Sequence, residues 1–316
     1  ESTATIGKRL EKIQVSNTED NRRAYRELLF TAPGLGEYIS GVICYDETLR
    51  QQASDARSFV EVMQSSRIVP GIKVDTGARP LAGSPAEKIT EGLDGLRERL
   101  QEYHALGARF AKWRAVLEVT AEFPSDYSLA VNAHALARYA ALCQENGLVP
   151  IVEPEVLMDG DHSIERCYEV TSRALNRVFA ELYAQRVDLS GMLLKPNMVI
   201  SASSCRTQAG AEDVARLTLQ CLRNHVPAVV PGVVFLSGGQ SDERATEHLS
   251  LMNRLAPAAP WKLSFSYGRA LQAAALKAWQ GKLDQVQAAQ AALLRRARFN
   301  AMAARGQYEP ALETAA

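Results

Sequence analysis

A lysine stands inside an apolar stretch, GMLLKPNM, at residues 191–198. Lys195 has Leu193, Leu194 and Met198 as its apolar neighbours. Burial among such side chains disfavours the ammonium, lowers the lysine pKa and leaves an amine that can attack a carbonyl. The segment therefore has two interpretations: a Schiff-base nucleophile, or a core lysine that is ion-paired or reaches the surface.

Three other apolar runs carry charged residues two positions apart. The pairs are Lys73 with Asp75, Lys112 with Arg114, and Glu153 with Glu155. Strand spacing places each pair on one face, where buried charges are costly unless paired or used. One pair could be a structural ion pair, whereas several near the carboxyl ends of adjacent strands indicate an active site. Lys112 would lower the pKa of Lys195 further, and Glu153 or Glu155 could supply general acid–base catalysis.

Two later runs end in small residues. They close with Ser237, Gly238 and Gly239, and with Ser266, Gly268 and Arg269. Glycine lets backbone N–H groups approach an anion where a helix begins. In barrels of parallel strands, the loops after strands seven and eight commonly bind phosphate. The two loops together therefore predict a phosphate site.

Seven β-type runs alternate with amphipathic helical stretches such as 128–147 and 163–185. The runs span residues 40–47, 67–75, 108–117, 148–157, 190–200, 229–239 and 261–268. This alternation predicts an α/β fold with a parallel sheet, and the charged strand ends favour a TIM (β/α)8 barrel. An open doubly wound sheet shares the alternation, but no GxGxxG motif follows an early strand.

A barrel needs one strand more than these seven. We expect strand one to lie largely upstream of residue 1, because residues 1–5 resemble a strand-exit loop with Ser2, Thr3 and Thr5 as candidate helix N-caps. The chain also lacks an initiator Met, so we interpret its N-terminus as truncated or processed. No Gly/Ser-rich linker divides the pattern. Residues 1–316 are predicted to form a single barrel domain with a short tail from about residue 305.

The composition excludes several classes of function. Lys plus Arg and Asp plus Glu both number 36, which removes the charge expected of a general nucleic-acid binder. No apolar run approaches the length of a membrane span. The five cysteines form no CxxC pair and indicate reduced thiols in a cytosolic protein.

Metal chemistry is the main alternative for activating a carbonyl. The five histidines are scattered, with no HxH or HxxxH pair, so no metal or other cofactor is expected. The stretch DGDH at residues 159–162 could hold ligands, but a polar loop is the favoured interpretation. Ser237 lacks the GxSxG context of a hydrolase nucleophile.

Taken together, these segments resemble class I fructose-1,6-bisphosphate aldolase over essentially the whole chain. The matching motifs are NRRAYRELL, GIKVD, EGLDGL, FAKWR, VPIVEPE, DGDH, LLKPNM, FLSGGQS and FSYGRALQ. The resemblance implies a TIM barrel, usually a homotetramer, that works in glycolysis and gluconeogenesis without a metal. Its partners would be fructose 1,6-bisphosphate and the triose phosphates.

The family's catalytic residues map onto matching motifs of this chain. Lys195 of LLKPNM would form the Schiff base with the ketose C2 carbonyl, and Glu153 of VEPE would be the acid–base residue. Lys112 of FAKWR would stabilise charge at the reacting carbons, with electrostatic support from Arg114. Glu155 is the further catalytic candidate.

The family's substrate residues map in the same way. Lys73 of GIKVD would lie near the sugar chain. The 1-phosphate would be held by Ser237, Gly238, Gly239, Ser266, Gly268 and Arg269. The 6-phosphate would face Ser2, Thr5 and Arg9.

The chain departs from the family pattern at four places. The family has a catalytic Asp just before ES, and this chain begins one residue later, so we expect the native protein to extend upstream. The tail YEPALETAA ends in alanine, where animal members end in a tyrosine. Ile200-Ser201-Ala202 replaces a usual Thr-Pro-Gly, and Thr76 replaces a usual lysine.

Two alternatives to this aldolase remain. One is another Schiff-base lyase on the same barrel, for example one acting on a monophosphate, and the other is a non-catalytic or regulatory scaffold form. The sequence as a whole resembles the bacterial and plastid members of this aldolase family. With no transit peptide visible, we favour the bacterial cytoplasm.

Overall fold

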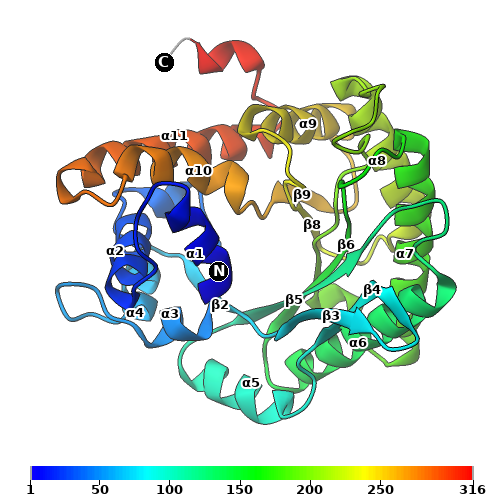
Figure 1. The fold of residues 1–316 in the computed structure, drawn as a ribbon, viewed down its shortest axis with the longest axis horizontal. Coiled ribbons are helices and arrows are strands. Elements are labelled where there is room, and N and C mark those ends of the chain that lie inside the picture. Colours follow the sequence, from blue (N-terminus) through cyan, green and yellow to red (C-terminus); the bar gives the residue numbers. More distant parts are fainter. Residues whose placement is uncertain (1, 315–316) are drawn as a thin grey trace.

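The computed structural model describes residues 2–314, and its centre is one curled parallel sheet. In spatial order the strands are β1 (Gly41–Cys44), β2 (Val69–Lys73), β5 (Phe110–Leu117), β6 (Val149–Val156), β7 (Leu193–Leu194), β8 (Gly232–Phe235) and β9 (Lys262–Phe265). All seven predicted runs are thus confirmed as neighbouring strands. Helices lie around the outside of the sheet, as Figure 1 shows, which is the arrangement of a β/α barrel.

Eleven α-helices occur in residues 2–314. They are α1 (Thr3–Glu11), α2 (Glu19–Phe30), α3 (Asp46–Arg50), α4 (Phe59–Ser65), α5 (Leu96–Ala105), α6 (Asp126–Glu145), α7 (Ile164–Ala184), α8 (Ala211–His225), α9 (Asp242–Leu255), α10 (Arg269–Trp279) and α11 (Val286–Ala303). Short 3₁₀ turns lie at η1 (Leu35–Glu37), η2 (Leu189–Gly191), η3 (Leu283–Gln285) and η4 (Pro310–Glu313). The helices predicted at 128–147 and 163–185 correspond to α6 and α7.

Strand register brings the charged residues of different motifs side by side. Lys73 on β2 is the register partner of Lys112 on β5. Arg114 on β5 is in turn the partner of Glu153 on β6. Because parallel strands end at one edge of the sheet, these side chains gather at its carboxyl end.

A hairpin that the sequence did not predict lies between β2 and α5. Its strands, β3 (Gly77–Leu81) and β4 (Ser84–Glu91), pair only with each other. Pro80 and Pro85 obscure it in the sequence, since proline suits the edges of sheets and here both strands are edges. The hairpin docks on the barrel through Thr90, whose hydroxyl donates to the Arg114 carbonyl at 2.7 Å.

The N-terminal residues differ in part from the prediction. Ser2 is the N-cap of α1, and its hydroxyl accepts from the Thr5 amide at 3.4 Å. Thr3 and Thr5 are already helical and cap nothing, so the expected loop is shorter than predicted. Residue 1 lies outside the described residues. β1 and β9 are the two ends of the seven-stranded sheet, and residues 2–314 add no eighth strand to it, so the upstream strand stays a prediction.

The segment after α11 packs against the barrel. Tyr308 is fully buried, and its hydroxyl donates to Glu313 at 2.8 Å. Its backbone exchanges hydrogen bonds with the Ser250 hydroxyl on α9. The predicted tail is therefore held to α9 through Tyr308 and to α11 through Glu313, which binds Arg296. The single-domain organisation stays a prediction.

Candidate active site

A cavity of about 410 Å³ opens at the carboxyl end of the sheet. It brings together thirteen of the fifteen residues predicted from the sequence: Ser2, Thr5, Arg9, Lys73, Lys112, Arg114, Glu153, Glu155, Lys195, Ser237, Ser266, Gly268 and Arg269. Gly238 and Gly239 do not line it. Seven separate segments of the chain contribute these side chains, so the cavity exists only in the folded barrel.

Three buried charges form the centre of the cavity. The Nζ atom of Lys195 lies 3.2 Å from Oε1 of Glu153. The other oxygen of Glu153 lies 3.4 Å from Nζ of Lys112. The three residues are 9%, 3% and 7% exposed, respectively. One carboxylate therefore bridges two ammonium groups where water is largely excluded.

The balance of charges sets the proton affinity of each group. Burial, assisted by the nearby Lys112, lowers the pKa of Lys195, although Glu153 partly opposes this. Burial alone would raise the pKa of Glu153, but Lys195, Lys112 and Arg114 together lower it. Burial would likewise lower the pKa of Lys112, yet Glu153 and Asp75 raise it. Of the two lysines that contact Glu153, Lys195 is therefore the more easily deprotonated, with a carboxylate beside it to take the proton.

Asp75 is a member of the cluster that the site prediction did not include. It accepts from Nζ of Lys73 at 2.5 Å, lies 3.5 Å from Nζ of Lys112 and accepts from the Arg114 amide at 3.4 Å. Asp75 thus holds the cations of β2 and β5 in place. The GIKVD motif carried the signal for it, because Asp75 follows Lys73 at the two-residue spacing of a strand face.

The outer carboxylate, Glu155, has a different partner. Its side chain accepts from Nε of Arg114 in a short charge-assisted hydrogen bond. The Arg114 side chain is 43% exposed and so lies at the mouth of the cavity. Glu155 is therefore engaged by an arginine, whereas Glu153 is engaged by the reactive lysine.

One side of the cavity is formed by the loops after β8 and β9. Ser237 follows β8, and Gly268 precedes Arg269, the first residue of α10. Gly238 and Gly239 have φ values of 56° and 80°, which glycine adopts without strain. A Cβ at Gly239 would lie 2.7 Å from the Met158 sulfur and 3.2 Å from NH2 of Arg269, so glycine leaves room for both side chains. Serine hydroxyls, loop amides and one arginine suit a phosphate group.

Another part of the cavity wall is formed by α1, which presents Ser2, Thr5 and Arg9. Arg9 contacts Gln272 on α10, with 3.4 Å between NH1 and Oε1. The two serine and threonine hydroxyls and the arginine make a second anion site chemically available.

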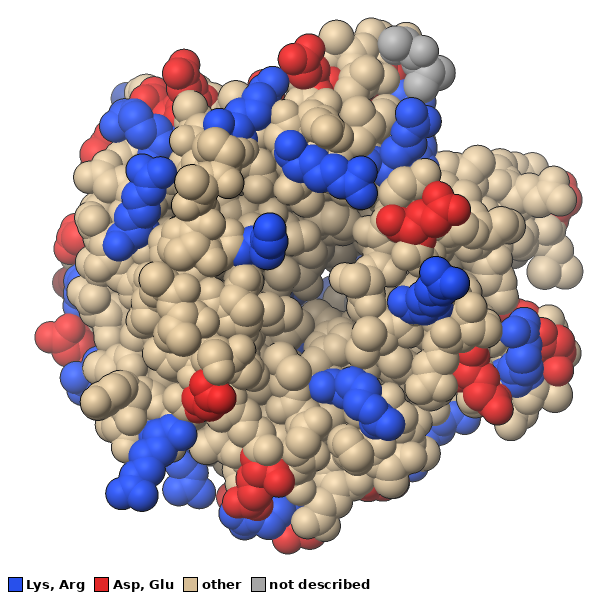
Figure 2. All heavy atoms as spheres, turned by 180° about the vertical axis from the view of Figure 1, so that it is seen from behind, with Lys and Arg blue, Asp and Glu red and all other residues tan. Residues whose placement is uncertain are grey.

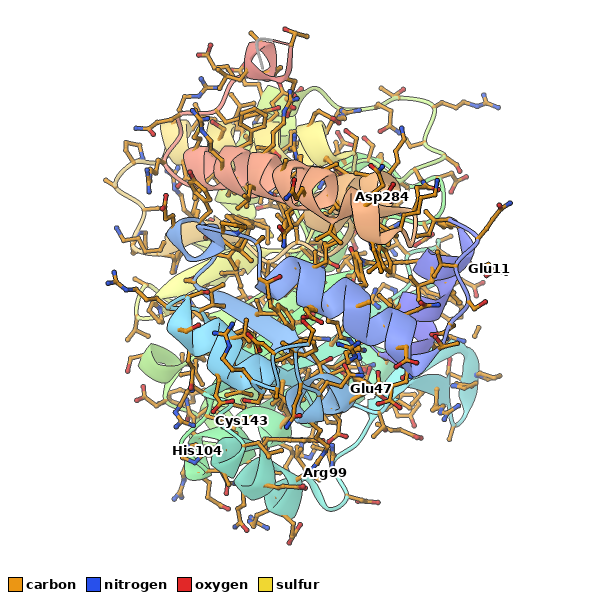
Figure 3. The ribbon with its side chains drawn as sticks, turned by 90° about the vertical axis from the view of Figure 1, so that its left-hand side faces the viewer. Glu11, Glu47, Arg99, His104, Cys143 and Asp284 are labelled. Carbon is orange, nitrogen blue, oxygen red and sulfur yellow. The ribbon has the colours of Figure 1, made fainter. Side chains whose placement is uncertain are left out.

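A buried ion-pair network between α2 and α3 is connected to α1 through Asn17. Arg22 and Arg26 on α2 both bind Glu47 of α3 at 2.5 Å, and Figure 3 shows Glu47 close beside α2. Arg22 also donates to the Asn17 side chain at 3.0 Å, and Asn17 donates to the Thr3 carbonyl at 3.4 Å. The sequence did not single out this network, since its residues resemble an ordinary solvated helix face.

Three further features concern metal ligands, membrane spans and surface charge. Among residues 2–314, no cluster of three or more His, Cys, Asp and Glu side chains is arranged to hold a metal ion. In the same residues, every helix is too short or too polar to cross a membrane. On the face shown in Figure 2, basic and acidic side chains are interspersed and do not separate into areas of one sign.

We predict that Asp75→Asn destabilises the protein at neutral pH. Removing one partner of a buried ion network leaves Lys73 and Lys112 uncompensated, so we expect a loss of about 3–5 kcal/mol in the free energy of unfolding. Urea titration followed by circular dichroism measures it. Asp126→Asn is the control, because its side chain is 96% exposed beside Arg173 and the change should cost at most about 1 kcal/mol.

The pH dependence of that loss follows from the Asp75 pKa. Burial opposes the shift, but Lys112 and Lys73 lower the pKa below its ordinary value of 3.8. A lowered native pKa contributes stability above the unfolded value, and this stability is lost as pH falls through the native value. The difference between wild type and Asp75→Asn should therefore shrink below about pH 4. A constant difference down to pH 2 would contradict the ion-pair role.

Comparison with known proteins decides the family. The family model described as "Glycolytic: Fructose-bisphosphate aldolase class-I" matches residues 1–316. The chain belongs to the class I fructose-bisphosphate aldolase family. Its expected fold and its expected activity, the cleavage of fructose 1,6-bisphosphate by a carbon–carbon lyase of glycolysis, are thereby confirmed.

Individual relatives agree with this family. The chain is 57% identical over 310 residues to "Probable fructose-bisphosphate aldolase class 1" of Xanthomonas campestris pv. campestris, covering 98% of this chain and 92% of the relative. It is 53% identical to "Fructose-bisphosphate aldolase 4, cytosolic" of Arabidopsis thaliana, covering 98% and 79% of the two chains. A solved structure of fructose-bisphosphate aldolase from Plasmodium falciparum, in complex with TRAP and an inhibitor, superimposes with a TM-score of 0.96 at 50% identity, covering 98% and 89%.

Proposed function

We propose that Lys195 is the Schiff-base nucleophile of this aldolase. The observation that carries the proposal is the position of its amine, buried at the floor of the cavity and 3.2 Å from the Glu153 carboxylate. A lowered lysine pKa and an adjacent proton acceptor are what amine attack on a ketone requires. The structural alternative is a core lysine that only forms an ion pair. This alternative does not explain why Lys195 lines a cavity with so many polar side chains.

The proposed reaction begins at the C2 carbonyl of the open-chain ketose. Glu153 takes a proton from the Lys195 ammonium, and the amine adds to C2 to give a carbinolamine. Glu153 then returns a proton to the C2 hydroxyl, which leaves as water and gives an iminium. Lys112 and Arg114 favour the ionised form of this carboxyl group and would stabilise negative charge that develops at the reacting carbons.

The C3–C4 bond then breaks, and its electrons flow into the iminium. A carboxylate of the cavity accepts the proton of the C4 hydroxyl, and glyceraldehyde 3-phosphate leaves with a new aldehyde. An enamine remains on Lys195. Return of that proton to C3 restores the iminium, and addition of one water releases dihydroxyacetone phosphate and the Lys195 ammonium. The proton taken from C4 is thus returned at C3, the water lost on dehydration is replaced, and no redox change occurs.

Two anion sites would hold the two phosphates. The 1-phosphate would be held by Ser237, Gly238, Gly239, Ser266, Gly268 and Arg269, and the 6-phosphate by Ser2, Thr5 and Arg9, with Lys73 near the sugar chain. Lysine and arginine side chains that line the cavity support the binding of two phosphates. Glu155 would act indirectly, by fixing Arg114.

The test of the proposed function is a borohydride trap. Reduction in the presence of dihydroxyacetone phosphate should leave a covalent adduct that peptide mass spectrometry locates on Lys195. Cleavage of fructose 1,6-bisphosphate should also persist in EDTA. An adduct on another lysine, or activity lost on chelation and restored by a divalent metal, would overturn the assignment.

Arg9→Met should separate the two phosphate sites. We expect kcat/KM for fructose 1,6-bisphosphate to fall roughly 10- to 100-fold, since a hydrogen bond to a charged group is lost. The rate on fructose 1-phosphate should stay unchanged, because that substrate lacks the 6-phosphate. Initial rates on the two substrates measure this, and equal losses on both would contradict the assignment of Arg9.

The proposal extends to assembly and location. A homotetramer in the cytoplasm would fit the cytosolic name of the Arabidopsis relative and the implication of the family resemblance. Sedimentation at about four times the chain mass of 34.6 kDa would support it, and a monomer at micromolar concentration would reject it.

A further inference from the structure

The side chain of Gln240 hydrogen-bonds within the loop between β8 and α9. The Gln240 amide N–H donates to the Ser237 carbonyl at 3.0 Å, and its side-chain Nε2 donates to the same carbonyl at 2.9 Å. Ser237 lines the cavity, whereas Gln240 does not. The position of Ser237 therefore depends on which way the Gln240 side chain points.

That side chain is in turn held by His248. This histidine lies two turns into α9, is 1% exposed, and places Nδ1 2.6 Å from Oε1 of Gln240. Its other ring nitrogen, Nε2, has no hydrogen-bond partner within residues 2–314. His248 has no role in the proposed Schiff-base chemistry. The burial of a polar histidine at this position therefore requires a different explanation.

The hydrogen-bond directions define the histidine tautomer. Nε2 of Gln240 donates to Ser237, which leaves Oε1 as the atom that faces His248. A carboxamide oxygen only accepts, so Nδ1 of His248 must carry the proton. Burial, with Arg244 nearby, lowers the pKa of His248 to about 4, and the ring is therefore neutral with a bare Nε2. If Nδ1 of His248 were unprotonated, it would accept a hydrogen bond, and the Gln240 amide would turn over to donate to it. Oε1 of Gln240 would then face the Ser237 carbonyl oxygen, and two acceptors would repel each other.

The same glutamine reaches the segment that carries Lys195. Its Nε2 lies 3.6 Å from the sulfur of Met198, which is 1% exposed. The Leu236 amide donates to the Pro196 carbonyl at 3.1 Å, next to the lysine in sequence. The Ser237 loop and the Lys195 segment are thus joined by two contacts.

We propose that His248 is a positioning residue that acts through Gln240 to fix the phosphate-binding loop at Ser237 relative to Lys195. The inference rests on the proposed function, in which this loop binds the 1-phosphate. That phosphate belongs to dihydroxyacetone phosphate, whereas the other phosphate belongs to glyceraldehyde 3-phosphate. His248 therefore governs the binding of one triose and not of the other.

The test measures both triose KM values in the condensation direction. His248→Leu keeps an apolar side chain of similar volume but removes the donor, and we expect KM for dihydroxyacetone phosphate to rise about five- to tenfold, the loss of one neutral hydrogen bond. KM for glyceraldehyde 3-phosphate and kcat should change little. His248→Asn places an amide N–H where Nδ1 was, and it should restore the wild-type KM.

A matched control comes from His225 at the end of α8. Its Nδ1 lies 2.8 Å from Oδ1 of Asn176, so it makes the same kind of bond far from the cavity. His225→Leu should leave both KM values unchanged. Wild-type KM values in His248→Leu, equal rises for the two trioses, or no recovery in His248→Asn would each overturn the proposal.

Gln240→Glu keeps the proposal testable if His248→Leu fails to fold. A carboxylate cannot donate to the Ser237 carbonyl, and the side chain is only half-buried, so the same selective rise in KM is expected. No selective rise in Gln240→Glu would overturn the proposal. A wild-type protein that gives no borohydride adduct at Lys195 would instead reject the proposed function itself, which separates the two failures.

Discussion

Lys195→Met should abolish cleavage of fructose 1,6-bisphosphate. We expect kcat to fall roughly 10⁴-fold or more, because removing the nucleophile of a covalent mechanism removes the whole pathway. Methionine fills the buried space and adds no charge, so the barrel should still fold. Steady-state cleavage, coupled to reduction of the triose products, measures the loss.

Lys262→Met is the control for this change. Lys262 begins β9, is exposed and lies at the amino end of its strand, away from the cavity. Its variant should keep full activity and still form the borohydride adduct, while Lys195→Met should form none. Residual activity above about 1% of wild type in Lys195→Met would show that another amine serves as the nucleophile.

Glu153→Gln should lower kcat by about 10²- to 10⁴-fold, the usual contribution of a general acid–base group. The amide cannot take the Lys195 proton or return one to the leaving hydroxyl. It also removes the only carboxylate within 4 Å of Lys195 among the described residues. We expect the rate of borohydride trapping with dihydroxyacetone phosphate to fall in parallel, since iminium formation is the step affected.

Glu155→Gln distinguishes proton transfer from charge alone. It removes the same charge two residues along the same strand, but its partner is Arg114 and not the lysine. We expect a smaller loss in kcat than for Glu153→Gln, without a matching fall in the trapping rate. Equal losses in both variants would show that net charge in the cavity, and not proton transfer by Glu153, controls the rate.

The strands and the catalytic candidates could be predicted because their patterns are local. Seven apolar runs marked seven strands, and the two-residue spacing of Lys112 with Arg114 and of Glu153 with Glu155 placed each pair on one face. The burial of Lys195 could likewise be expected from its neighbours Leu194 and Met198. Such patterns involve only a few successive residues, so they can be recognised without knowledge of the fold.

The supporting contacts could not be predicted because they join residues far apart in the chain. Glu47 binds Arg22 and Arg26 from another helix, and the hairpin of β3 and β4 carries prolines that resemble a loop. His248 seemed an isolated histidine until α9 placed it 2.6 Å from Gln240. No spacing rule relates such pairs, since packing alone brings them together.

The sequence by itself determined the kinds of residue at the strand ends, and hence a buried lysine with acids, cations and phosphate loops. Only the tertiary structure decided which carboxylate forms an ion pair with which cation. The register of β5 and β6 and the curl of the sheet set Glu153 between Lys195 and Lys112, and left Glu155 to Arg114. Electrostatic interactions weaken with distance and strengthen with burial. The short distances from Glu153 to Lys195 and Lys112 therefore set the different pKa shifts of these two lysines.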